Sequence, residues 1–247
     1  MTKVKNLWKP VFMNKIKIKK STGDLPRGPV NLFARFISPN PITTFTPEQR
    51  FPIINNTAFI SQYSSVVGDV TLSKNVYIAP NATLRADEGT PFYVGENTNI
   101  QDGVVLHGLA HEYILVDNKK YSIYIANSVS IAHGALIHGP SYIGEKVFVG
   151  FKSIIFNASI GHGSVISMDS VVTGGVKIAP NRFVPPGAHV DTQAKADSLR
   201  RVPKDQVEFA REVQRVNGEF PHSYHLLFGT ERCSCGVAFE RNFLLKK

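Results

Sequence analysis

Aliphatic residues recur every six positions through the middle of the chain, and this spacing sets the predicted fold. They stand at Val66, Leu72, Ile78, Leu84, Val94, Ile100 and Leu106, then at Ile125, Ile131, Ile137, Ile143, Val149 and Ile155, and finally at Ile160, Ile166, Val172, Ile178, Val184 and Val190. A period of six fits neither the 3.6-residue turn of a helix nor the two-residue alternation of a half-buried strand. It predicts short strands with a turn after each, wound into a β-solenoid.

The repeat is interrupted at three places and resumes its register after each of them. Four extra residues lie between Leu84 and Val94 (the four-residue slip), a long interruption follows Leu106, and one position is missing before Ile160. Three six-residue sides make one coil, so each aliphatic side chain stacks inside the prism on its equivalent three repeats away. A β-sandwich, the alternative all-β fold, would need strands spaced by 8–12 residues.

Four segments differ in composition and periodicity, and their predicted bounds are 1–50, 51–195, 196–220 and 221–247. The first is rich in Lys, Pro, Thr and Asn and is interpreted as a basic arm, extended or poorly ordered. The second carries the repeat. In the third, Phe209, Val213, Val216 and Phe220 recur at helical spacing, which predicts an amphipathic helix lying back on the prism. The fourth is interpreted as an irregular tail.

Charge and composition exclude several classes of protein. The net charge of +9 comes from 28 basic and 19 acidic residues, but seven of the lysines fall within residues 1–20, so the remaining chain is nearly neutral. A nucleic-acid partner would therefore rest on the arm alone, and none is expected. No run of 18 apolar residues predicts a membrane-spanning helix, and no apolar stretch near the start predicts a secretory signal. The two cysteines, Cys233 and Cys235, are interpreted as free thiols of a cytoplasmic protein, with organelle or microcompartment targeting left open.

Two histidines occupy the same phase of the repeat. His107 follows Leu106 and His138 follows Ile137, and the two are one coil apart once the long interruption between them is removed. Arg85 follows Leu84 in the same way, so the three side chains form one outward column. Neighbouring coils lie about 4.8 Å apart, which lets two imidazoles share a metal ion.

His133 is out of phase with that column. It stands two places after Ile131, on the preceding side of the prism, so within one chain it does not easily join His107 and His138. A neighbouring chain in a threefold trimer would present it, which predicts an intersubunit site of three histidines with an open fourth position. The alternative is a structural ladder of surface histidines without metal.

The polar residues around these histidines carry a family resemblance. Arg85–Gly89, Asn99–Gly103, His107, Ala132–His133 and His138–Pro140 resemble the γ-class carbonic anhydrases, over roughly residues 40–220. The stretch Arg85–Leu109 is most similar to the N-terminal domain of the cyanobacterial carboxysome scaffold protein, a member of that class. The resemblance implies a homotrimer of left-handed parallel β-helices, each followed by a C-terminal helix. It also implies one zinc ion per subunit at the subunit interface, with iron or cobalt as alternatives.

The resemblance also implies a role for each matching residue. His107 and His138 would bind the ion from one chain and His133 from its neighbour. Arg85 and Asp87 would form an ion pair near the subunit contact, with Asn99 adjoining, and Asp102 falls in the same motif. Glu88 and Gln101 would face the metal-bound water, and Asn217 would lie near the site. In archaeal members a glutamate three positions after the first ligand acts as a proton shuttle, but Ala110 stands there in this chain.

The implied activity is reversible hydration of CO2 to bicarbonate by a metal-bound hydroxide. A bound divalent ion lowers the pKa of water from ~15.7 to roughly 7, and Glu88 would accept a proton from a new water molecule. Two alternatives stay open. One is a weakly active or inactive scaffold module of the same fold with a protein partner, as in carboxysomes. The other is a hexapeptide-repeat acyltransferase that binds acetyl-CoA and uses one histidine as general base.

Overall fold

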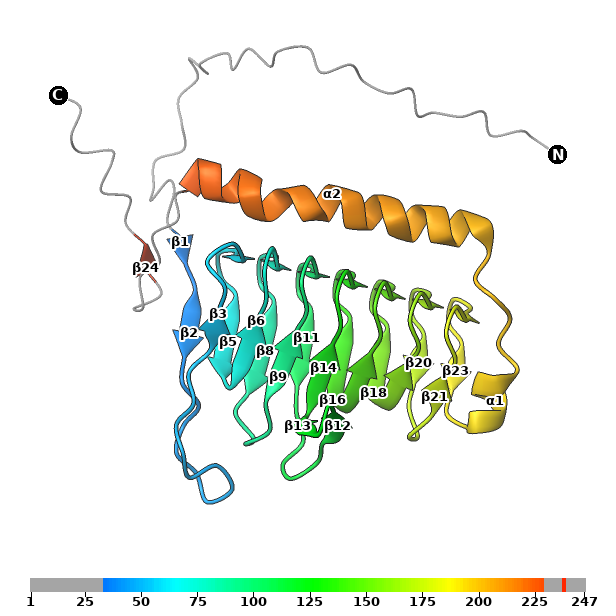
Figure 1. Cartoon of the computed structure of the whole chain (residues 1–247), viewed down its shortest axis with the longest axis horizontal. Coiled ribbons are helices and arrows are strands. Elements are labelled where there is room, and N and C mark those ends of the chain that lie inside the picture. Colours follow the sequence, from blue (N-terminus) through cyan, green and yellow to red (C-terminus); the bar gives the residue numbers. More distant parts are fainter. Residues whose placement is uncertain (1–32, 229–236, 239–247) are drawn as a thin grey trace, which may run out of the picture. The chain divides into compact units, whose positions relative to one another are not determined.

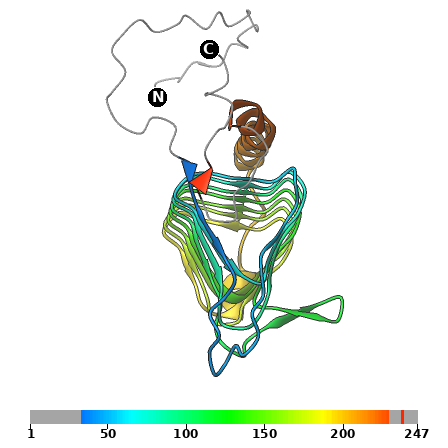
Figure 2. The same ribbon diagram turned by 90° about the vertical axis from the view of Figure 1, so that its left-hand side faces the viewer.

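The computed structural model describes residues 33–228 and 237–238, and it confirms the predicted solenoid. Parallel strands form successive coils, and a long helix runs beside them (Figure 1). Viewed along its axis, the β-helix has a triangular cross-section (Figure 2). The predicted architecture, a left-handed parallel β-helix followed by a C-terminal helix, is therefore the architecture of this chain.

The three sides of the prism are named here by what they carry. The histidine face is formed by β2 (Phe36–Ser38), β5 (Ser65–Gly68), β8 (Thr83–Ala86), β11 (Val105–His107), the first halves of β16 (Leu136–Ile143) and β18 (Ile154–Ile160), β20 (Val171–Val172) and β23 (His189–Val190). The third face is formed by β3 (Ile53–Ile54), β6 (Val70–Leu72), β9 (Phe92–Val94), β14 (Ile123–Ile125), the second halves of β16 and β18, and β21 (Lys177–Ile178). The helix face is formed by β4 (Phe59–Ile60), β7 (Tyr77–Ile78), β10 (Asn99–Ile100), β15 (Ser130–Ile131), β17 (Phe148–Val149), β19 (Val165–Ile166) and β22 (Phe183–Val184).

The remaining elements lie outside the three faces. They are β1 (Phe33–Ala34), paired antiparallel with β24 (Val237–Ala238), the antiparallel hairpin β12 (Ile114–Val116) and β13 (Lys119–Tyr121), and the helices α1 (Gln193–Asp197) and α2 (Lys204–Phe228). Helix α2 contacts β4, β7, β10, β15 and β19, which gives the helix face its name.

The aliphatic ladder forms the core as predicted. None of the aliphatic residues of the repeat is more than 3% exposed. Strand pairing aligns Leu84, Leu106 and Ile137 on consecutive coils, so each side chain packs on its equivalent above and below. The backbone amides and carbonyls of each coil are satisfied by its neighbours, which makes the coils mutually dependent.

Truncation of one ladder residue is expected to destabilise the fold strongly. Ile131 is fully buried between Ile100 and Val149. We expect Ile131→Ala to lower the free energy of unfolding by about 2–5 kcal/mol, because the rigid neighbouring coils leave a cavity. Urea unfolding measures this effect. Leu115→Ala in the exposed hairpin is the matched control and should change stability little.

The interruptions of the repeat lie close to the histidines. The four-residue slip forms the loop between β8 and β9, which carries Asp87 and Glu88. The long interruption after Leu106 contains the hairpin β12–β13, which projects from the prism (Figure 2). The missing position appears as a register shift between β16 and β18 next to His138. The solenoid thus departs from regularity where polar side chains gather.

The described part of the predicted arm, residues 33–50, contributes a strand to the solenoid. Strand β2 pairs in parallel with β5, and the Phe36 amide donates to the carbonyl of Ser64 at 2.9 Å. Arg35 donates to the carbonyl of Ile60 at 3.1 Å. Without β2, strand β5 would present an unpaired edge at this end of the solenoid, and β2 covers that edge. Residues 1–32, which carry the lysines of the expected arm, lie outside the described residues.

The predicted C-terminal helix is present but its bounds are different. Helix α2 begins at Lys204 and continues through Pro221 to Phe228, where an irregular tail had been expected from residue 221. Aromatic contacts hold this extension, because Tyr224 stacks on Phe59 with ring centroids 5.1 Å apart. Cys233 and Cys235 lie outside the described residues. Neither helix of residues 33–228 combines the length and apolar character needed to span a membrane.

Candidate metal-binding site

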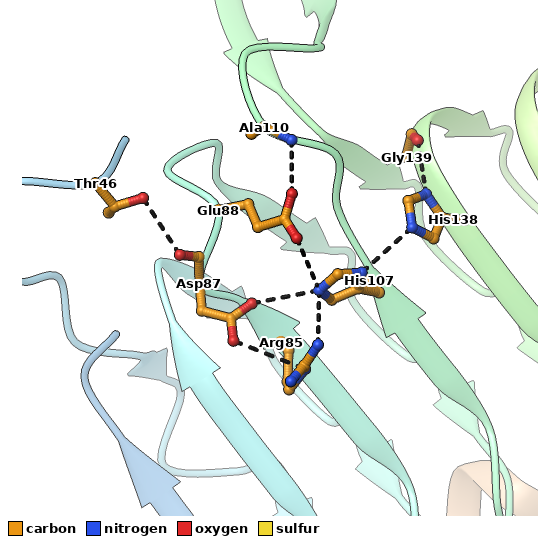
Figure 3. A network of polar contacts seen from close by, with 8 residues as sticks. All are labelled: Thr46, Arg85, Asp87, Glu88, His107, Ala110, His138 and Gly139. Carbon is orange, nitrogen blue, oxygen red and sulfur yellow. Dashed lines mark hydrogen bonds and ion pairs between the residues drawn. The ribbon is translucent and has the colours of Figure 1, made fainter. Parts of the chain in front are cut away.

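The predicted column of Arg85, His107 and His138 is confirmed on the histidine face. Strand pairing sets His107 opposite Arg85 on one side and His138 on the other. The Nδ1 atom of His107 lies 3.2 Å from Nε2 of His138 (Figure 3). Two imidazoles therefore meet on adjacent coils at hydrogen-bond distance, with both rings outside the aliphatic core.

The hydrogen bonds of the column run in one direction. The Arg85 guanidinium only donates, and it contacts Nε2 of His107 at 2.8 Å. The Gly139 carbonyl only accepts, and it lies 3.0 Å from Nδ1 of His138. These contacts are satisfied when each ring carries a proton on Nδ1, so that His107 donates to Nε2 of His138. A carbonyl that holds a histidine in this tautomer makes Nε2 the nitrogen that can bind a metal.

Burial of the imidazole lowers the pKa of His107, and the neighbouring Arg85 charge lowers this pKa further. The carboxylates of Glu88 and Asp87 act in the opposite direction on the same pKa and only partly offset these effects. His107 is therefore neutral at physiological pH. The neutral imidazole is the form that binds a metal.

Two carboxylates complete this cluster from the loop after β8. Oε1 of Glu88 and Oδ1 of Asp87 lie 3.4 and 3.5 Å from Nε2 of His107. The other oxygen of Glu88 accepts a hydrogen bond of 2.7 Å from the Ala110 amide, which fixes the carboxylate (Figure 3). Asp87 Oδ1 is buried and has no hydrogen-bond partner within the described part of the chain. A buried carboxylate oxygen without a donor favours a cation nearby.

The third histidine lies elsewhere in the chain. His133 follows β15 at the corner after the helix face, and its Nδ1 is 3.0 Å from Oδ2 of Asp102. Both side chains are more than half exposed, and the His133 ring stacks on Phe151 with centroids 5.6 Å apart. Asp102 orients the ring and leaves its Nε2 available.

The remaining predicted residues belong to the helix face. Asn99 and Gln101 are buried, at 1% and 4% exposure, and hydrogen-bond to each other at 3.0 Å. Asn217, on the covering helix α2, donates to the Val213 carbonyl at 3.0 Å. In the single chain these three side chains are not hydrogen-bonded to His107 or Glu88. Among residues 33–228 and 237–238, no group of three or more His, Cys, Asp or Glu side chains could hold a metal.

Several residues of these clusters were not anticipated from the sequence. Phe156 meets the His138 ring edge to face at 5.2 Å, and Phe151 stacks on His133. Each phenylalanine stands one coil after its histidine, so the repeat that aligned the column would have found both. Gln214 of α2 also contacts Asn99, three positions before the predicted Asn217. In the sequence, only the spacing of three residues between Gln214 and Asn217 indicates that both lie on the same side of the helix.

The fold and the two polar clusters define a hexapeptide-repeat β-solenoid protein with candidate metal ligands on its surface. A putative acetyltransferase structure from Bacillus cereus shares the fold, with a TM-score of 0.64 at 25% identity over 78% of this chain and 99% of that one. The carbonic anhydrase of Methanosarcina thermophila is 40% identical over 179 residues, which is 68% of this chain and 72% of that protein. The chain belongs to the γ-class carbonic anhydrase family.

A second relative is named for assembly rather than for catalysis. The carboxysome assembly protein CcmM of a Nostoc species is 46% identical over 165 residues, covering 66% of this chain. The matched region spans only 30% of that protein's length. No family model matches the chain.

Proposed function

We propose that this protein is a metal-dependent carbonic anhydrase whose active site is completed between two copies in a homotrimer. One observation carries the proposal. His107 and His138 meet on one face with 3.2 Å between ring nitrogens, while His133 stands half-exposed at a different corner of the prism. A neighbouring copy would supply the third imidazole, because the phase of the repeat places His133 on a different side of the prism from His107 and His138.

An exposed apolar strip beside the histidine column supports association with a second copy. Val105, Leu136 and Ile154 are aligned on consecutive coils, each two positions before the column position. Val105 and Ile154 are 37% and 36% exposed. Aliphatic side chains in register on an open sheet face are typical of a subunit interface. We therefore propose that this strip packs against the corner that carries His133.

The donor set fits zinc, with iron or cobalt as alternatives. Three neutral imidazoles and one open position are the ligand set of catalytic zinc sites. His107 and His138 would hold the ion from one chain and His133 from its neighbour. When bound, the cation would make a water molecule acidic enough to ionise near neutral pH.

The surrounding residues suit the hydration of CO2. The reaction converts CO2 and water to bicarbonate and one proton, so a base must accept that proton. Glu88 fits this role, because one of its oxygens faces His107 while the Ala110 amide holds the other. The backbone amide that holds Glu88 belongs to Ala110, the position in the sequence at which archaeal members carry their shuttle glutamate. Gln101 and Asn217 would orient the reacting molecules.

Metal removal tests the proposal directly. We expect chelator-treated protein to hydrate CO2 at the uncatalysed rate, and activity to return with about one zinc or ferrous ion per chain. Stopped-flow assays with metal analysis and light scattering would measure rate, stoichiometry and trimer mass together. Full activity in protein shown to be free of metal would contradict the proposal.

The second candidate is a scaffold module with little activity. The 46% identity to a carboxysome assembly protein favours it. It predicts trimers that bind metal, lack measurable hydration and capture a protein partner. An acyltransferase function has in its favour the structural likeness to a putative acetyltransferase. Acetyl-CoA binding by calorimetry would support it.

A further inference from the structure

Resting on the proposed function, we propose that Gln214 of helix α2 is a positioning residue that sets the orientation of the Gln101 amide. Gln214 and Gln101 are not hydrogen-bonded to each other. They are joined through Asn99, in a line of three side-chain amides that ends on a backbone carbonyl. The helix thereby decides which atom Gln101 presents to a reacting molecule.

A backbone carbonyl determines how the three side-chain amides are oriented. Gln214 contacts the carbonyl oxygen of Asn97, and only the NH2 end of an amide can make this contact. The Oε1 atom of Gln214 must then face away from Asn97. It accepts hydrogen bonds from Asn99 at 3.0 Å and from the Ser130 hydroxyl at 2.8 Å.

The direction passes on to Gln101. Both N–H groups of Asn99 are used, one by Gln214 and one by Ser130 at 2.8 Å, so Asn99 turns its Oδ1 toward Gln101. The NH2 group of Gln101 donates to this oxygen at 3.0 Å. Its Oε1 atom accepts no hydrogen bond within the described part of the chain. Gln101 is therefore held as an acceptor, suited to orient an O–H group of water.

Burial makes the arrangement rigid. Asn99 and Gln101 are almost inaccessible to solvent, and Ser130 is buried beside them. Reversing the Asn99 or the Gln101 amide would place two acceptors or two donors against each other without water to relieve them. The orientation of Gln101 thus depends on a helix residue from a distant part of the sequence.

A double-mutant cycle on metal-free protein tests the line without reference to activity. Gln101→Glu places an oxygen against Oδ1 of Asn99, so we expect the melting temperature to fall by about 4 °C. In a Gln214→Met background Asn99 is free to turn and donate, and the fall should be less than half as large. Gln206→Met on the same helix is the control and should leave the effect of Gln101→Glu unchanged. Equal losses in both backgrounds would refute the proposal.

Kinetics then tests the positioning role. We expect Gln214→Met to lower kcat for CO2 hydration about tenfold at unchanged metal content, with KM within a factor of two. Gln214→Glu keeps the acceptor for Asn99 but loses the donor to the Asn97 carbonyl, so it should retain clearly more kcat than Gln214→Met. Equal loss of kcat in both variants would show a merely structural role and overturn the inference. If the wild-type protein proves inactive, the proposed function fails. The melting temperatures of the double-mutant cycle still test whether Gln214 orients the Gln101 amide.

Discussion

His107→Ala is expected to lower CO2 hydration at least about 100-fold, because losing a residue that only orients a metal ligand already costs about 10–100-fold and this variant removes a ligand. It should also lower the bound metal well below one ion per chain. The fold should survive, since the side chain lies outside the aliphatic ladder and the adjacent Leu106 stays in place. Stopped-flow hydration and metal analysis of the same sample measure both effects.

His162→Ala is the matched control for this variant. His162 is an exposed histidine on the same solenoid and lies outside both polar clusters, so the variant should keep wild-type metal content and rate. A His107→Ala protein that folds, loses its metal and still hydrates CO2 at the wild-type rate would remove the basis of the proposed site. Loss of metal with no activity in either protein would favour the scaffold alternative.

The sequence was sufficient to predict the solenoid because its core is made by one simple rule. Every coil needs an aliphatic residue at each of three inward positions, so the repeat is visible without any knowledge of contacts. The same rule aligned His107 with His138 and separated His133 from them, since phase along the chain determines which side of a prism a residue occupies. Strand pairing then confirmed the column residue by residue.

Features that depend on the interruptions and on α2 were not predictable in this way. The loop after β8 has no repeat phase, so nothing in the sequence indicates that Glu88 accepts from the Ala110 amide. The extension of α2 past Pro221 depends on Tyr224 meeting Phe59, a contact between the end of the helix and one of the first coils. Asp102 was assigned to a motif without a contact, and the structure makes it the partner of His133.

The division of the polar residues into two clusters has a consequence for function. One cluster offers two imidazoles and two acids, and the other offers the His133 imidazole beside the Asp102 carboxylate. Among the described residues, neither cluster brings three or more of these side chains into an arrangement that could hold a metal ion. If the proposed assembly is right, each site draws on two chains. Dissociation of the trimer would then abolish metal binding and activity together.

Mixed trimers should recover activity from two inactive variants. His138→Ala keeps His133, and His133→Ala keeps His107 and His138, so each homotrimer lacks one ligand at every site. Co-expression with two affinity tags and purification on both isolates trimers that contain the two variants. In a cyclic trimer of either composition, one interface joins an intact His107–His138 pair to an intact His133. We therefore expect about one third of the wild-type rate per trimer.

A second mixture separates this result from simple refolding or contamination. His107→Ala and His138→Ala damage the same side of the proposed interface, so no pairing of these chains restores both ligands on one face. Their mixed trimers should remain as inactive as the parents in the stopped-flow assay. A site built within one chain predicts no recovery in either mixture, because every chain then lacks a ligand. Recovery in the first mixture alone requires histidines from two copies to meet at one cation.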